Sequence, residues 1–125
     1  MRDLSITATD DSPAVFLKEN GTVLCVQGRS TSAVAASSFR QISLWMDEFL
    51  NKSQQPDLCF EFRLEYYNTL TSRLLLDIFL KMEKMKEKGR SVSVDWFFEK
   101  YDTDLKEAGE AYSSMVKIPF RFHEI

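Results

Sequence analysis

Several short stretches of the chain alternate between apolar and polar residues, as strands with one buried face do. The clearest is residues 56–67, PDLCFEFRLEYY, and residues 90–98 repeat the pattern. Two β-rich runs within residues 14–28 flank Asn20-Gly21, which predicts a hairpin with a tight primed turn. Residues 117–125 predict a last strand at a sheet edge, because Pro119 cannot donate to a ladder. The face of 56–67 expected in the core carries Leu58, Phe60, Phe62, Leu64 and Tyr66.

Three other stretches place apolar residues three and four positions apart, which indicates amphipathic helices. They cover residues 30–52, about 70–88 and 102–115, and Gly89 is placed to end the second helix in a left-handed conformation. The inward residues expected in the three helices are, in order, Phe39, Ile42, Trp45, Met46, Phe49 and Leu50; Leu70, Leu74, Leu75, Ile78, Phe79 and Met82; Leu105, Ala108, Tyr112 and Met115.

The predicted element order is therefore ββαβαβαβ. Strands that alternate with helices favour right-handed crossovers and helices packed on a sheet. We predict an α/β fold with a mixed β-sheet, one face well covered and the other partly wet, formed by a single domain over residues 1–125.

Composition and charge exclude several classes of function. Apolar residues make up 44% of the 125 and the net charge is −3, so the chain is expected to fold without a basic surplus for nucleic acid. No apolar run approaches the roughly 20 residues needed to span a bilayer. The first 13 residues are polar and acidic, unlike a signal peptide, and a cytoplasmic protein is the simplest interpretation.

Residues that could carry catalysis do not converge in the sequence. The sole histidine, His123, has no evident partner group, and Cys25 and Cys59 fall inside predicted strands as buried thiols. Neither a CxxC pair, a histidine cluster nor a glycine-rich phosphate loop is present. We therefore expect no enzyme activity, no catalytic residue, no metal and no cofactor.

Four hydrogen-bonding side chains gather where the strand of residues 56–67 gives way to the next helix: Asn68, Thr69, Thr71 and Ser72. One interpretation is redundant helix capping, because such side chains satisfy free N–H groups of a first turn. The other is a phosphorylation switch, because a helix N-terminus tolerates a phosphate and Arg73, one turn after Thr69, could pair with it.

The chain resembles the SiaC-type regulatory phosphoproteins, whose fold is similar to that of the STAS anti-sigma factor antagonists. The resemblance runs over most of the chain and rests on the order and spacing of short motifs together. These are Tyr66-Tyr67-Asn68-Thr69, Asp77-Ile78, Gly89-Arg90-Ser91-Val92, Trp96, the stretch EAGEAY at 107–112 and Ile118-Pro119-Phe120.

The resemblance implies a non-enzymatic switch. A cognate kinase of the anti-sigma type would phosphorylate the threonine that follows asparagine, here Thr69, and a PP2C-like phosphatase would remove the phosphate. The unmodified form would bind and activate a diguanylate cyclase, which raises cyclic di-GMP and promotes biofilm formation. Asn68 would hold the turn, with Thr71, Ser72 and Arg73 as supporting residues.

The sequence departs from the family pattern at two places. Leu70-Thr71 stands where two serines are usual, and residues 30–38 replace a Tyr-Pro-Glu-Asn-like stretch. An antagonist of an anti-sigma factor, without a cyclase, therefore stays an alternative. A small-molecule-binding or catalytic domain, suggested by Trp96, Phe97 and Phe98, is a third.

Overall fold

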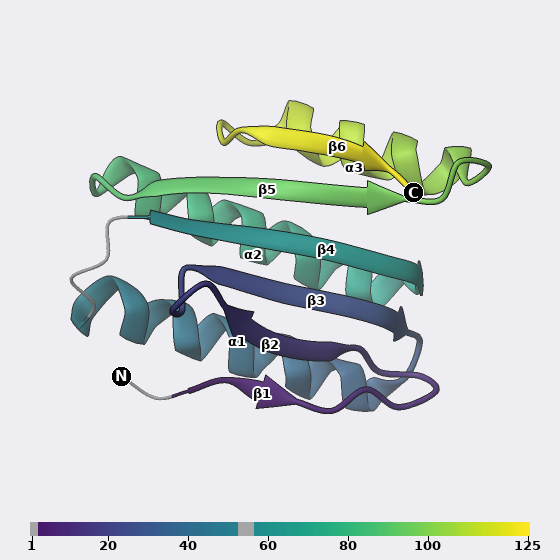
Figure 1. The fold of residues 1–125 in the computed structure, drawn as a ribbon, viewed down its shortest axis with the longest axis horizontal. Helices are drawn as coiled ribbons and strands as arrows, with labels where there is room; N and C mark the ends of the chain where they lie inside the picture. The colour runs from purple at the N-terminus through teal and green to yellow at the C-terminus, as the bar shows by residue number, and fades with distance from the viewer. Residues whose placement is uncertain (1–2, 53–56) are drawn as a thin grey trace.

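The computed structural model describes residues 3–52 and 57–125, which form one six-stranded sheet with helices on one face (Figure 1). The strands lie in chain order; β1–β2 and β2–β3 are antiparallel, and the pairs from β3 to β6 are parallel. The elements are β1 (Ser5–Ile6), β2 (Ala14–Lys18), β3 (Val23–Ser30), α1 (Ala33–Lys52), β4 (Asp57–Tyr67), α2 (Thr69–Glu87), β5 (Ser91–Phe98), α3 (Thr103–Met115) and β6 (Phe120–Glu124).

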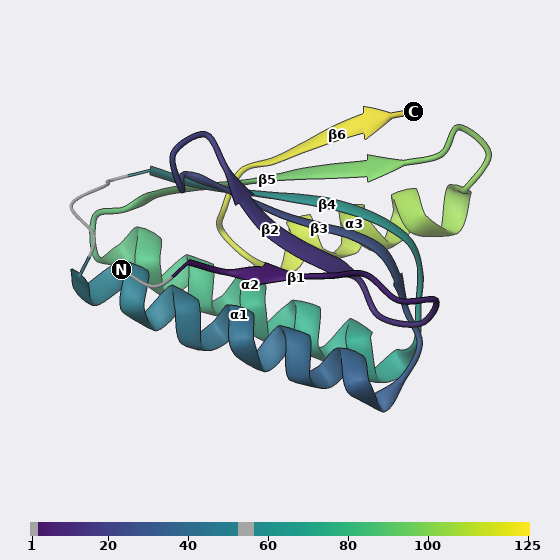
Figure 2. The same cartoon turned by 60° about the horizontal axis from the view of Figure 1, so that its bottom comes forward.

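The mixed α/β architecture expected from the sequence is confirmed, with one strand added at the N-terminal end. All three helices lie on the same side of the sheet and leave its other face uncovered (Figure 2). The added strand, β1, has only two residues, and they pair with Val15 and Phe16 of β2. Two residues are too few to show an alternating pattern, so this strand could not be predicted from the sequence.

The connection between β2 and β3 is a primed turn, but it is centred one residue earlier than predicted. Glu19 and Asn20 both have positive φ, 54° and 58°, and the N–H of Gly21 donates to the carbonyl of Lys18 at 3.1 Å. Gly21 also has positive φ, 83°. The predicted two-residue turn is therefore a longer connection, in which three successive residues adopt left-handed conformations.

A bulge in β4 overturns one predicted core position. Gly28 of β3 pairs with Leu64, but Arg29 pairs with Tyr66, so one residue of β4 is left over. An extra residue reverses the in-and-out alternation beyond it. Tyr66 is consequently 56% exposed, and Tyr67 packs against the core in its place.

Two residues expected on the inner faces of helices are exposed. Leu70 is 45% exposed because the first turn of α2 buries Thr71 instead, and adjacent helical positions differ by about 100°. Met115 is 59% exposed because the chain becomes extended at Val116, whose side chain is buried next to it. The other inward positions expected in the helices are buried or packed against the core. No helix within the described residues has the length and apolar character needed to cross a membrane.

Candidate functional site

The strand-to-helix junction at the end of β4 places each of the four side chains singled out in the sequence. Asn68 has extended backbone dihedrals, φ −89° and ψ 178°, and is the N-cap of α2. Its side-chain oxygen Oδ1 accepts the N–H of Thr71 at 2.9 Å, and its carbonyl accepts the N–H of Ser72 at 3.0 Å. Asn68 is therefore the residue that caps the helix.

Thr71 binds the first turn of α2 to the end of β3. Its side chain is buried, and its hydroxyl lies 2.7 Å from the hydroxyl of Ser30 and 3.2 Å from the Ser30 carbonyl. The N–H of Asn68 donates to the same carbonyl at 3.0 Å. These contacts fix the helix start to the sheet, because a buried hydroxyl is costly to leave unpaired.

Ser72 binds the same turn to α3. The hydroxyl of Tyr112, a buried residue, donates to the Ser72 carbonyl at 2.9 Å, and the two hydroxyls lie 3.0 Å apart. The pKa of the neighbouring Tyr67 phenol is raised, by burial first and then by the Tyr112 hydroxyl, so Tyr67 stays neutral. The start of α2 is thus held by β3 on one side and α3 on the other.

Thr69 differs from the other three side chains. It is exposed at the first position of α2, and its hydroxyl makes no hydrogen bond within residues 3–52 and 57–125. Arg73, one turn later, is also exposed, and the first turn of α2 contains no acidic residue. A phosphate on Thr69 would therefore meet a helix N-terminus and a nearby guanidinium, with no carboxylate in that turn to repel it.

Thr69 lies on a helical surface with two leucines. Thr69, Arg73, Leu76 and Leu80 follow one another at spacings of four, three and four residues, which places them along one face of α2. Leu80 is 40% exposed and Leu76 is half-buried. We call these four residues the outer stripe of α2. The outer stripe was not predicted, although leucines at these intervals from Thr69 are visible in the sequence.

Because Asn68 caps α2 and the Thr69 hydroxyl makes no hydrogen bond, we expect their replacement to change the free energy of unfolding by different amounts. Asn68→Ala is expected to lower the free energy of unfolding by about 1 kcal/mol, because it removes the cap from the first turn. Thr69→Ala should change it by less than about 0.5 kcal/mol, because an exposed side chain without partners is lost. Urea denaturation of both variants measures the difference, and equal costs would contradict the assignment of the cap.

The cysteines and the histidine lie elsewhere, on the uncovered face of the sheet. Both thiols are free, as predicted; Cys25 is buried and Cys59 is partly buried, and burial raises the pKa of each to about 11. His123 Nε2 lies 2.9 Å from the carboxylate of Asp95, which also receives Arg121 at 2.7 Å. Burial alone would raise the pKa of Asp95, but these hydrogen bonds outweigh it and hold that pKa well below its usual range.

Comparisons with known proteins find relatives that match nearly the whole chain. Residues 6–125 match the family described as SiaC family regulatory phosphoprotein. An uncharacterized protein of Pseudomonas aeruginosa (strain UCBPP-PA14) is 30% identical over 120 residues, which are 96% of this chain and 94% of that protein. The crystal structure of apo-SiaC from Pseudomonas aeruginosa superimposes with a TM-score of 0.89 at 29% identity, over 98% of this chain and 99% of that one. SiaC in complex with the diguanylate cyclase SiaD, of which it is the activator, gives a TM-score of 0.90 at 28% identity, over 98% and 100%.

Proposed function

This chain belongs to the SiaC family of regulatory phosphoproteins, and we propose that its unmodified form binds and activates a diguanylate cyclase through the outer stripe of α2. In this proposal the phosphorylation of Thr69 blocks that binding. The observation that supports this proposal is a difference among the four junction side chains. Asn68, Thr71 and Ser72 make hydrogen bonds within the fold, whereas Thr69 is exposed and makes none to the described residues.

A cognate kinase can reach Thr69 without unfolding the chain, because its hydroxyl already faces solvent. In the transfer, the Thr69 oxygen forms a bond to the γ-phosphorus of ATP, the bond to ADP breaks, and the kinase takes the hydroxyl proton. A PP2C-like phosphatase would reverse the state by hydrolysis. The chain itself supplies the acceptor and the binding surface rather than catalytic groups.

The phosphate would act on the partner rather than on the fold. It adds roughly −1.5 to −2 charges to the end of the outer stripe, where a partner must displace water from the leucines. The first turn of α2 stays anchored, because Thr71 and Ser72 hold it to β3 and α3. The cyclase would then meet a hydrated, negatively charged group at the end of the stripe, and binding would weaken.

The contact surface is tested by Leu80→Glu, which places a charge on the outer stripe without touching Thr69. We expect the affinity of the unmodified chain for the cyclase to fall at least about tenfold, because a charge at a contact must lose its water. Met115→Glu on α3, at a leucine-sized side chain that is 59% exposed, is the matched control and should bind as the wild type does. Isothermal titration calorimetry measures both affinities.

Equal affinities for Leu80→Glu and the wild type would exclude the outer stripe as the contact. If the unmodified chain bound an anti-sigma factor and no cyclase in the same titrations, the cyclase partner would be wrong and the antagonist alternative would replace it.

A further inference from the structure

The start of α3 matches the start of α2 in its hydrogen bonds. Asp102 is the N-cap of α3, and its side-chain Oδ1 accepts the N–H of Leu105 at 3.0 Å, while its carbonyl accepts the next N–H along the chain at 3.2 Å. The corresponding distances at Asn68 are 2.9 and 3.0 Å. Thr103 follows Asp102 at the first helical position, as Thr69 follows Asn68.

The two threonines are also alike in their exposure. Thr69 and Thr103 are both exposed, and neither hydroxyl makes a hydrogen bond with any residue in 3–52 or 57–125. A kinase that approached this chain would therefore find two free hydroxyls, each at the first position of a capped helix. A helix N-terminus favours a phosphate in both places. Hydrogen bonding and access therefore do not explain why one threonine would be modified rather than the other.

The side chains around the two threonines differ in charge. Three equivalent positions, counted from each cap, carry Asn68, Leu70 and Arg73 at the start of α2 and Asp102, Asp104 and Glu107 at the start of α3. Lys106 offsets one of these three carboxylates, so the six residues from the cap onward carry a net charge of −2 in α3 and of +1 in α2. A phosphate adds roughly −1.5 to −2 charges, so it is attracted at the start of α2 and repelled at the start of α3.

Arg73 is the residue that distinguishes the two helix starts most sharply. It lies four positions after Thr69, the spacing at which side chains of a helix meet, and it is exposed, so its guanidinium can pair with a phosphate there. Arg73 makes no ion pair or side-chain hydrogen bond with the residues that the structure describes. Glu107 lies four positions after Thr103 and is also exposed. A phosphate on Thr103 would therefore meet a carboxylate where a phosphate on Thr69 meets a guanidinium.

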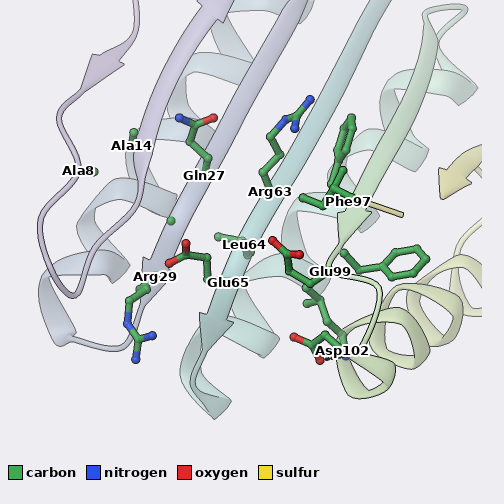
Figure 3. A pocket seen from close by; sticks show the side chains of 14 residues that line it. Ala8, Ala14, Gln27, Arg29, Arg63, Leu64, Glu65, Phe97, Glu99 and Asp102 are labelled. Atoms are coloured by element: carbon green, nitrogen blue, oxygen red, sulfur yellow. Dashed lines mark hydrogen bonds between the residues drawn. The ribbon is translucent and has the colours of Figure 1, made fainter. Parts of the chain in front are cut away.

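The two helix starts adjoin at the carboxyl end of β4. Asp102 and Asp104 line one cleft together with Tyr66 and Tyr67, the last two residues of β4. Figure 3 shows Asp102 at the beginning of α3, with its carboxylate directed toward the end of β4. The negative charge at the start of α3 therefore extends toward the start of α2. Arg73 opposes this charge, so a cation at its position matters more than it would on an isolated helix.

We propose that the charge around the acceptor, rather than the geometry of the helix start, directs the cognate kinase to Thr69 and not to Thr103. Arg73 is the main specificity-determining residue, and the uncharged side chains of Asn68 and Leu70 add no repulsion. This inference rests on the proposed function, in which Thr69 is the acceptor. As the phosphoryl group passes from ATP to Thr69, its charge is spread over three oxygens. A guanidinium one turn away stabilises that charge, and a carboxylate in its place would destabilise it.

The first measurement needs no kinase. Full-length chains that carry phosphothreonine at position 69 or at position 103, installed by genetic-code expansion, are titrated with pH and followed by ³¹P NMR. The second pKa of the phosphate, about 6 when unperturbed, is expected to be at least about 0.5 lower at position 69 than at position 103, because a cation favours the dianion and carboxylates disfavour it. Arg73→Met should raise the pKa at position 69 by at least about 0.3. Lys84→Met, at an exposed position about three turns later in α2, is the control and should leave it unchanged.

The second measurement exchanges the charges in a kinase reaction. The triple variant Asn68→Asp, Leu70→Asp, Arg73→Glu gives α2 the side chains of α3, and it should lower kcat/KM for the phosphorylation of Thr69 at least about tenfold. Aspartate caps a helix as well as asparagine does, and the other two positions are exposed, so circular dichroism should show a folded chain. Arg73→Lys, which keeps the charge, should stay within about threefold of the wild type. Lys84→Glu is the matched control and should react as the wild type does.

Equal second pKa values at positions 69 and 103, or a normal kcat/KM for the triple variant, would overturn the proposal. A slow kinase reaction together with an unchanged phosphate pKa in Arg73→Met would also overturn it, because Arg73 would then act on the kinase and not on the phosphate. A kinase that leaves Thr69 unmodified in the wild-type chain would instead refute the proposed function. Mass-spectrometric mapping of the modified residue distinguishes that failure from the others.

Discussion

Complete phosphorylation of Thr69 is expected to lower the affinity for the cyclase at least about thirtyfold, the effect of placing a bulky, hydrated negative group in a contact. The reason is the position of the acceptor at the end of the outer stripe, beside leucines that a partner must cover. Calorimetric titration of a cyclase with phosphorylated and unmodified chain measures the ratio. Circular dichroism of the phosphorylated chain should match the unmodified spectrum, because the anchored first turn of α2 does not depend on Thr69.

Two variants control for the phosphate itself. Thr69→Ala should bind the cyclase as the unmodified chain does and should no longer respond to the kinase. Thr69→Asp should weaken binding less than phosphothreonine, because aspartate carries one charge and fewer acceptor oxygens. Equal affinities for the phosphorylated and unmodified chains would show that Thr69 is not the switch, whatever the partner is.

The largest effect on stability is expected from Phe79→Ala, which should lower the free energy of unfolding by about 3–5 kcal/mol. Phe79 is fully buried, and its ring centroid lies 5.0 Å from that of Tyr112, 5.2 Å from Phe120 and 5.4 Å from Phe62. It therefore joins α2 to α3 and to two strands. Removing the ring leaves a cavity at the centre of the core, and urea denaturation measures the loss.

The adjacent residue is a matched control. Leu80 follows Phe79 in the same helix but is 40% exposed, so Leu80→Ala should lower the free energy of unfolding by less than about 1 kcal/mol. It should nevertheless weaken cyclase binding. Similar losses of stability for the two variants would contradict the division of α2 into an inner face that packs and an outer stripe that binds.

The elements that could be predicted are those whose evidence is local. Helical spacing placed α1, α2 and α3 to within a few residues, and alternation placed β4 and β5. The errors occur where pairing between distant residues decides the outcome. The bulge that exposes Tyr66 depends on the register of β3 against β4, and the buried position taken by Thr71 depends on Ser30.

Dependence on distant residues also explains why the roles of the site residues could not be assigned from the sequence. It showed four hydrogen-bonding side chains at the start of α2 but could not assign them. The hydrogen-bond partners of Thr71 and Ser72 are Ser30 and Tyr112, which lie about forty positions away in the chain. Of the three aromatic residues suspected of binding a ligand, Trp96 and Phe98 are buried in the core, and the ring of Phe97 is covered by the guanidinium of Arg63, 3.7 Å from its centroid.

The proposed switch requires that Thr69 is the residue that is phosphorylated. The most direct test is mass-spectrometric mapping of phosphorylation sites on this protein from its native cells, with the cognate phosphatase deleted so that the phosphate persists. We predict a phosphoryl group on Thr69 and none on Thr71 or Ser72, whose hydroxyls are already hydrogen-bonded. An unmodified Thr69 in the presence of an active kinase, or a phosphate on Thr71 or Ser72 instead, would show that Thr69 is not the switch.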